Sequence, residues 1–181
     1  MLTWLRQRRS TERISRALYG SSVSAARAPA LYATLQVPDT LAGRFEMVVL
    51  HTFLIMNRLT TEGEAGNAMA RALAEAMVEQ LDDDYRELGV SDVRVAKKVR
   101  AAAAAAYGRF EAYRASVEKA DAGVLADALV KNVYDGEEGR RPEAKRLAQH
   151  ALACVESLAA QPGERLLAGQ VELPHFEGST S

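Results

Sequence analysis

Apolar residues recur at helical spacing along most of the chain, and the longest such run lies between Pro38 and Leu59. Its apolar positions include Phe45, Val48, Val49, Leu50, Phe53, Leu54, Ile55, Met56 and Leu59. They occupy most of the helix circumference, which is typical of a helix buried inside a domain. His51, Asn57 and Arg58 interrupt the run, so it is too short to cross a bilayer, which takes about 20 apolar residues. The pattern predicts a buried central helix over residues 40–61, with Asp39 or Thr40 as its cap.

The other apolar runs also follow the helical period. They predict helices over residues 12–27, 30–35, 67–88, 92–119, 121–134 and 142–161. Gly20 predicts a bend or break in the first of these. The six alanines of 101–106 predict a thin helix in the middle of the bundle or against the central helix, with Gly108 allowing close approach.

Composition supports the same fold class. Five prolines, twelve glycines and abundant alanine, without alternating apolar runs, argue for helices rather than strands. We therefore predict an all-α protein, a single helical bundle of about six to seven helices around the buried helix 40–61. The domain division we expect is a basic N-terminal segment (1–16), a helical domain (17–161), and a C-terminal arm and flexible tail (162–181).

Charge and candidate ligands exclude several classes of protein. The net charge of −1 gives no nucleic-acid signature, so no DNA partner is expected. The basic N-terminal segment carries Leu2, Trp4 and Leu5 among arginines, which suits either packing on the domain or a peripheral membrane contact. The three histidines are far apart in sequence and no phosphate-binding loop is present, so neither a metal nor a cofactor is expected. Cys154 lies in an apolar helical run and is expected to be a buried structural thiol.

One constellation leaves two interpretations open. Arg44 and His51 are seven residues apart and share a helix face, with Glu46 between them. Such a polar pocket would suit a small enzyme or a protein that binds quinone or haem, whereas a buried histidine would be structural. No nucleophile with a paired base is present, so a non-enzyme is favoured. A third interpretation is a helical module that dimerises through the alanine-rich helix.

Several short motifs occur in an order that resembles the ubiquinol–cytochrome c chaperone family. They are Leu18-Tyr19-Gly20, Ala26-Arg27-Ala28-Pro29, Leu31-Tyr32, Val37-Pro38-Asp39-Thr40, Gly43-Arg44-Phe45-Glu46, Leu50-His51, Asp84 to Val90, Gly108-Arg109 and Asn132-Val133-Tyr134. The resemblance covers about residues 17–135. Ser91 and Tyr85 depart from the family pattern, where glycine and leucine are expected.

The resemblance implies an all-helical assembly factor that binds newly made cytochrome b, or another subunit, for the bc1 complex (ubiquinol–cytochrome c reductase). Other implied partners are the ribosomal tunnel exit, a small partner protein and the membrane surface. The short N-terminus favours a bacterial protein in the cytoplasm, docked at the inner membrane face, over the mitochondrial matrix. The residues expected to contact the client or partner are Tyr19, Arg27, Tyr32, Asp39, Arg44, Glu46, His51, Arg86 and Arg109.

Overall fold

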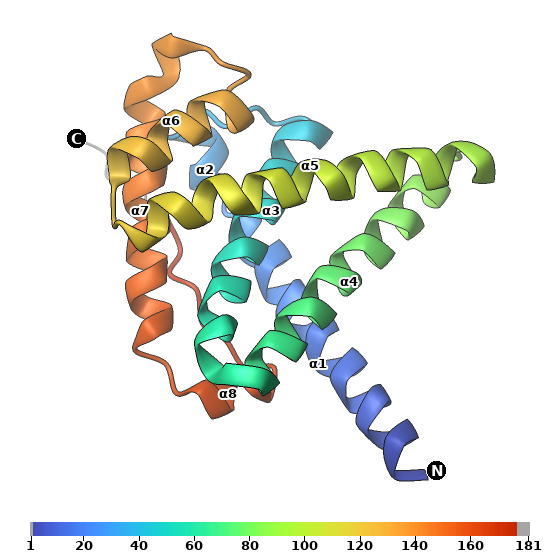
Figure 1. Ribbon diagram of the computed structural model, residues 1–181. Helices are drawn as coiled ribbons and strands as arrows, with labels where there is room; N and C mark the ends of the chain where they lie inside the picture. Colours follow the sequence, from blue (N-terminus) through green and yellow to red (C-terminus); the bar gives the residue numbers. More distant parts are fainter. Residues whose placement is uncertain (1, 177–181) are drawn as a thin grey trace.

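The computed structural model describes residues 2–176, with side chains from residue 6 onward. Within this range every regular element is a helix (Figure 1). The α-helices are α1 (Leu2–Ala26), α2 (Pro29–Ala33), α3 (Leu41–Leu59), α4 (Gly63–Glu87), α5 (Asp92–Glu118), α6 (Ala122–Val133), α7 (Arg141–Ala159) and α8 (Gly163–Leu167), with 3-10 turns at Thr60–Glu62 and Glu138–Arg140. The predicted all-α helical bundle is confirmed.

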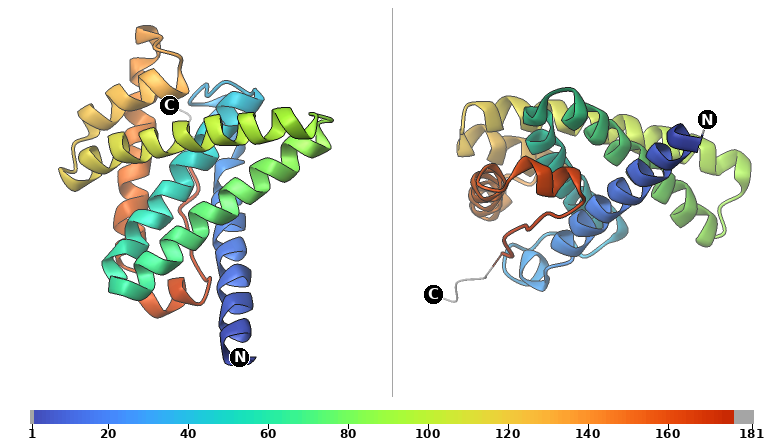
Figure 2. Two further views of the ribbon diagram at one scale, coloured as in Figure 1. Left: turned by 45° about the vertical axis from the view of Figure 1, so that its right-hand side comes forward. Right: turned by 90° about the horizontal axis from the view of Figure 1, so that it is seen from below.

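Helix α3 is the centre of the bundle, as its apolar circumference predicts. It packs against α1, α4, α5 and α7, and the other long helices surround it (Figures 1 and 2). Its N-terminus is capped by Thr40, whose hydroxyl oxygen accepts a hydrogen bond from the Gly43 amide at 3.1 Å. From Val49 to Ile55 every residue is buried, so this segment joins the surrounding helices into one core.

Three sequence-based expectations are corrected. Helix α1 begins at Leu2 rather than at residue 12, so the basic N-terminal stretch is part of this helix. Helix α1 runs unbroken through Gly20, because the serines that follow bond back to carbonyls one turn earlier and the helix packs on α3 and α4. Helix α4 begins at Gly63 rather than at residue 67, so the predicted link shrinks to a single 3-10 turn. Gly63 still marks the junction, with a left-handed φ of 65°.

The position of the alanine-rich helix is only partly as expected. Helix α5 lies across α3, α4 and α6, but most of the alanine run is exposed or half-buried and only Ala106 is fully buried. A Cβ atom added to Gly108 would meet nothing within 4 Å, so this glycine does not serve a close approach. The alanines therefore leave an open surface on α5, and dimerisation through it stays a prediction.

The C-terminal arm is tied to the bundle. Gln161 exchanges two hydrogen bonds with the backbone of Glu172, and Arg58 of α3 donates to the carbonyls of Leu158 and Gln161. Phe176 then packs edge-on against the ring of His150. The predicted flexible tail falls mainly on residues 177–181, which lie outside the described residues.

Candidate functional site

Four of the expected contact residues form one surface patch where α1, α2 and the start of α3 meet. Arg44 donates from Nε to Oδ1 of Asp39 at 2.6 Å, and both side chains are exposed. The hydroxyl of Tyr32 donates to the carbonyl of Ala26 at 2.7 Å, which holds its ring at this corner. Burial raises the pKa of Tyr32, while the nearby Arg44 and Arg27 lower it and Asp39 raises it. These mutual effects place all four residues, Arg27, Tyr32, Asp39 and Arg44, in one neighbourhood, named here the Tyr32 patch.

Tyr19 lies beside this patch, half-buried where α1 packs on α3 and α4. It contacts both the main core and the smaller cluster around Leu18 and Leu59. Burial raises its pKa to about 12, with Asp84 of α4 as the second cause and Arg27 opposing. The phenol therefore stays protonated at neutral pH and can donate a hydrogen bond at the edge of the Tyr32 patch.

Glu46 and Arg109 form a buried ion pair that joins α3 to α5. Arg109 Nη2 donates to Oε1 of Glu46 at 2.5 Å and its Nε donates to Oε2, so the contact is bidentate. The Glu46 side chain is 8% exposed and that of Arg109 20%. Burial raises the pKa of Glu46 and the Arg109 guanidinium lowers it, with a net rise. The pair therefore fixes the crossing of the two helices rather than presenting a free charge.

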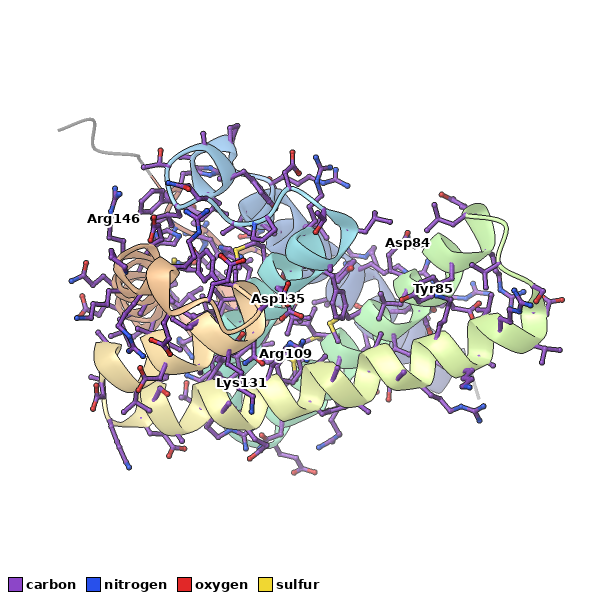
Figure 3. The ribbon with its side chains drawn as sticks, turned by 90° about the horizontal axis from the view of Figure 1, so that it is seen from above. Asp84, Tyr85, Arg109, Lys131, Asp135 and Arg146 are labelled. Atoms are coloured by element: carbon purple, nitrogen blue, oxygen red, sulfur yellow. The ribbon has the colours of Figure 1, made fainter. Side chains whose placement is uncertain are left out.

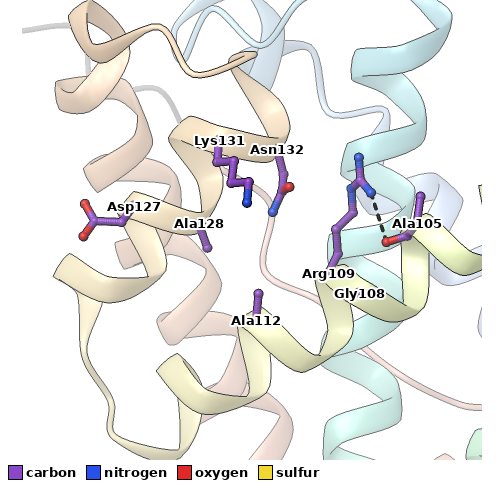
Figure 4. Close-up of a pocket in the computed structure, with 8 residues that line it drawn as sticks. All are labelled: Ala105, Gly108, Arg109, Ala112, Asp127, Ala128, Lys131 and Asn132. Carbon is purple, nitrogen blue, oxygen red and sulfur yellow. Dashed lines mark hydrogen bonds between the residues drawn. The ribbon is translucent and has the colours of Figure 1, made fainter.

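A groove opens beside this pair, between α5 and α6 (Figure 4). Its volume is about 560 Å³, and its walls are formed by Ala105, Gly108, Arg109, Ala112, Asp127, Ala128, Lys131 and Asn132. Figure 3 places Arg109, Lys131 and Asp135 in the same region, where α5 meets the end of α6. The α5 side is lined by small residues, so a partner side chain can approach the helix backbone closely.

His51 does not belong to either feature. Its ring is fully buried in α3, and Nδ1 lies 2.7 Å from the carbonyl oxygen of Met47. Arg44, by contrast, is exposed on Asp39. The expected polar pocket around Arg44 and His51 is therefore not formed. The histidine is part of the core, and an enzyme built on that pair loses its site.

The fold brings together residues that look unrelated in the sequence. The rings of His51 and His150 are 6.3 Å apart, and Nε2 of His150 lies 3.6 Å from Sγ of Cys154. Cys154 is buried as expected, and burial raises the pKa of its thiol to about 12. Within residues 2–176, no group of three or more histidine, cysteine, aspartate or glutamate side chains is placed to hold a metal ion. Histidines about 100 residues apart give no sequence signal of such contact.

Acidification is expected to destabilise the protein through His51. Burial, with a smaller effect of His150, lowers the pKa of His51 from 6.5 to about 4. Between pH 6.5 and pH 4 the ring is therefore protonated in the unfolded chain but neutral in the folded protein. Stability contributed by the neutral ring is complete above pH 6.5 and is lost as the pH falls toward 4. Urea unfolding at pH 7 and pH 5 should differ by about 2 kcal/mol from this residue. His51→Leu should reduce the difference by that amount, and an unchanged difference would contradict the burial effect.

Arg86 lies apart from the other expected contact residues. At the tip of the α4–α5 hairpin it donates from Nε to Asp82 at 2.5 Å and from Nη1 to Asp92. Its side chain is about half exposed, and both acids raise its pKa. The guanidinium therefore connects the end of α4 to the start of α5.

The fold and these surfaces define an all-helical protein that carries an exposed polar patch and a small groove in its described residues. Residues 33–175 match the family model described as Ubiquinol-cytochrome C chaperone. The chain therefore belongs to this family, and the resemblance noted in the sequence is confirmed. The family's name describes a chaperone, a non-enzymatic role.

Two relatives and one solved structure agree with this assignment. The ubiquinol-cytochrome-c reductase complex assembly factor 1 of Xenopus laevis is 26% identical over 72% of this chain, and that of Mus musculus 24% identical over 83%. The chain spans 65% and 50% of the lengths of these relatives. The crystal structure of the Cbp3 homolog from Brucella abortus superposes with a TM-score of 0.82, at 36% identity over 99% of each chain.

Proposed function

We propose that this protein is a chaperone that binds newly made cytochrome b and supports assembly of the bc1 complex. The observation that carries the proposal is the family match over residues 33–175, and both relatives are named as assembly factors of the ubiquinol–cytochrome c reductase complex. The near-complete overlap with the Brucella Cbp3 homolog supports a bacterial form of the same activity.

The Tyr32 patch is the surface we assign to the client or to a partner that accompanies it. It combines the exposed Arg27, a second arginine (Arg44) that is hydrogen-bonded to Asp39, and the ring of Tyr32 on a short helix. Arginine and tyrosine are the residue types that most often anchor protein interfaces. An acidic partner segment would be steered toward Arg27 by charge, while Tyr19 and Tyr32 supply apolar contact area.

The proposed place of action is the bacterial cytoplasm, at the inner face of the membrane where cytochrome b is inserted. In the described residues, no helix is both long and apolar enough to cross a bilayer. We propose that contact with the membrane is peripheral, and that the ribosome or a small partner protein meets the same end of the molecule as the Tyr32 patch.

A strain lacking the gene tests this function. We expect assembled bc1 complex and spectroscopic haem b to fall strongly, while other respiratory complexes keep their usual levels. A plasmid copy with Arg27→Glu and Arg44→Glu should restore less complex than the wild-type copy, because both changes reverse exposed charges without disturbing the core. A matched copy with Arg71→Glu and Arg114→Glu should restore the complex fully. Equal rescue by both variants would remove the Tyr32 patch from the proposal.

A further inference from the structure

The outer face of α5 carries an unusual combination of residues toward its N-terminal end. With 3.6 residues per turn, Val93, Lys97, Arg100, Ala104 and Tyr107 lie within an arc of about 80°. All five are exposed, and Arg94 flanks them. We call Val93, Arg94, Lys97, Arg100, Ala104 and Tyr107 the α5 basic face. It lies opposite the buried side of the helix, which carries Val95 and Val99.

The cations on this face are available for a partner. Arg94, Lys97 and Arg100 make no ion pair within the described part of the chain, whereas the neighbouring Lys98 turns back over the ring of Tyr85. Two acids of α5 lie at the ends of this face and are paired, Asp92 with Arg86 and Glu111 with Arg114. Asp83 and Glu87 lie, by helical spacing, on the side of α4 that faces away from α5. The stretch from Arg94 to Arg100 is thus a local concentration of cations on the outer side of α5.

Aliphatic side chains are exposed at the same end. Val93 is 87% exposed and Leu88, in the turn that precedes α5, is 61% exposed. Tyr107, at the other end of the face, is 53% exposed. The hairpin has only a small core of its own around Leu81, Val95 and Val99, and its tip projects away from α6 and α7 (Figures 1 and 2). These apolar side chains therefore stand at an outer extremity of the molecule.

We propose that the α5 basic face and Leu88 dock on an anionic lipid surface. Unpaired arginines and lysines are attracted to acidic headgroups, and their apolar stems can lie along the acyl boundary while the charges remain in water. Leu88 and Val93 can insert at that boundary, as apolar residues of interfacial helices do. A single-stranded RNA would instead favour aromatic rings for base stacking, and the two most exposed apolar residues of this tip are aliphatic. The face is distinct from the Tyr32 patch and from the basic segment 1–16.

Vesicle co-sedimentation with the full chain tests the proposal. We expect binding to phosphatidylcholine vesicles that contain roughly one third phosphatidylglycerol, no binding to pure phosphatidylcholine, and release by salt. Removing three cations with Arg94→Gln, Lys97→Gln and Arg100→Gln should weaken binding about a hundredfold, at about fivefold each. Leu88→Ser with Val93→Ser should weaken it about tenfold by removing the inserted apolar groups. All these positions are exposed, and circular dichroism verifies that the helices remain.

A matched variant controls for net charge. Arg71→Gln, Lys119→Gln and Lys145→Gln remove three exposed cations elsewhere and should change the affinity by no more than about twofold. Equal binding by the α5 triple variant and the wild type would overturn the proposal, because other basic groups such as the N-terminal arginines would then account for the binding. Failure of the wild type to bind anionic vesicles would also overturn it. In that case the α5 triple variant and the wild type should be compared on purified ribosomes and on an acidic protein. If only the wild type binds one of them, the face belongs to that partner instead.

Discussion

Arg109→Met is expected to lower the free energy of unfolding by about 3 kcal/mol, because it leaves a buried carboxylate without its partner. Glu46 is 8% exposed and receives two hydrogen bonds from the guanidinium. Burial already raises the pKa of Glu46, and loss of Arg109 removes the effect that opposes this rise. Because the pKa of Glu46 is higher in the folded protein than in the unfolded chain, its protonated form favours folding. The loss of stability in Arg109→Met should therefore grow as the pH rises through that pKa.

The double variant Glu46→Gln with Arg109→Met separates the ion pair from general packing. It removes both charges, so it should recover most of the lost stability. Arg86→Met is the matched control, since its ion pairs with Asp82 and Asp92 lie at the solvent-exposed tip of the hairpin and should contribute far less to stability. Urea unfolding of the four proteins measures the effect. If Arg109→Met cost no more than Arg86→Met, the Glu46–Arg109 pair would not be a structural link between α3 and α5.

Gly43→Ala is expected to cost more than about 3 kcal/mol, because a Cβ at this position would overlap a backbone atom. The added carbon would lie 2.0 Å from the carbonyl oxygen of Pro38, in the turn that leads into α3. No side-chain rotation relieves a backbone contact, so the cap made by Thr40 and the start of α3 must shift together. Thermal unfolding should show a large fall in Tm.

The control is Gly20→Ala in α1. Nothing lies within 4 Å of a Cβ added there, and alanine is the better helix former, so a gain of about 0.5–1 kcal/mol is expected. Equal effects of the two substitutions would show that Gly43 is chosen for helix flexibility and not for the close approach of Pro38.

Most of the helical framework follows from short-range rules of apolar spacing and helix capping. Apolar spacing located the buried helix α3, and the cap expected at Thr40 is present in the structure. Leu88 and Val124 fall in apolar helical runs and yet are exposed, because periodicity alone cannot tell an inner position from an outer one near a helix end. The prediction that Gly108 allows a close approach was wrong for a similar reason. A glycine in a helix can mark close packing, but it also occurs where nothing packs against the helix.

The site depended on contacts that local rules do not contain. Motif order identified Glu46 and Arg109 separately, but nothing in the sequence joins two residues 63 positions apart into an ion pair. The expectation that His51 shares a pocket with Arg44 was wrong. The two residues share a helix face, but the neighbouring helices cover His51 completely and leave Arg44 in solvent near the start of the helix. The groove beside α6 likewise exists only once α5 and α6 are packed together.

The most direct test of the proposed function is the haem b absorbance of membranes from a strain that lacks this gene, measured together with pulse-labelled cytochrome b. The predicted result is that cytochrome b is synthesised but turns over rapidly, so that haem b and assembled bc1 complex are both lost, and that the wild-type gene restores them. Normal haem b and normal assembled complex in the deletion strain would contradict a role in bc1 biogenesis.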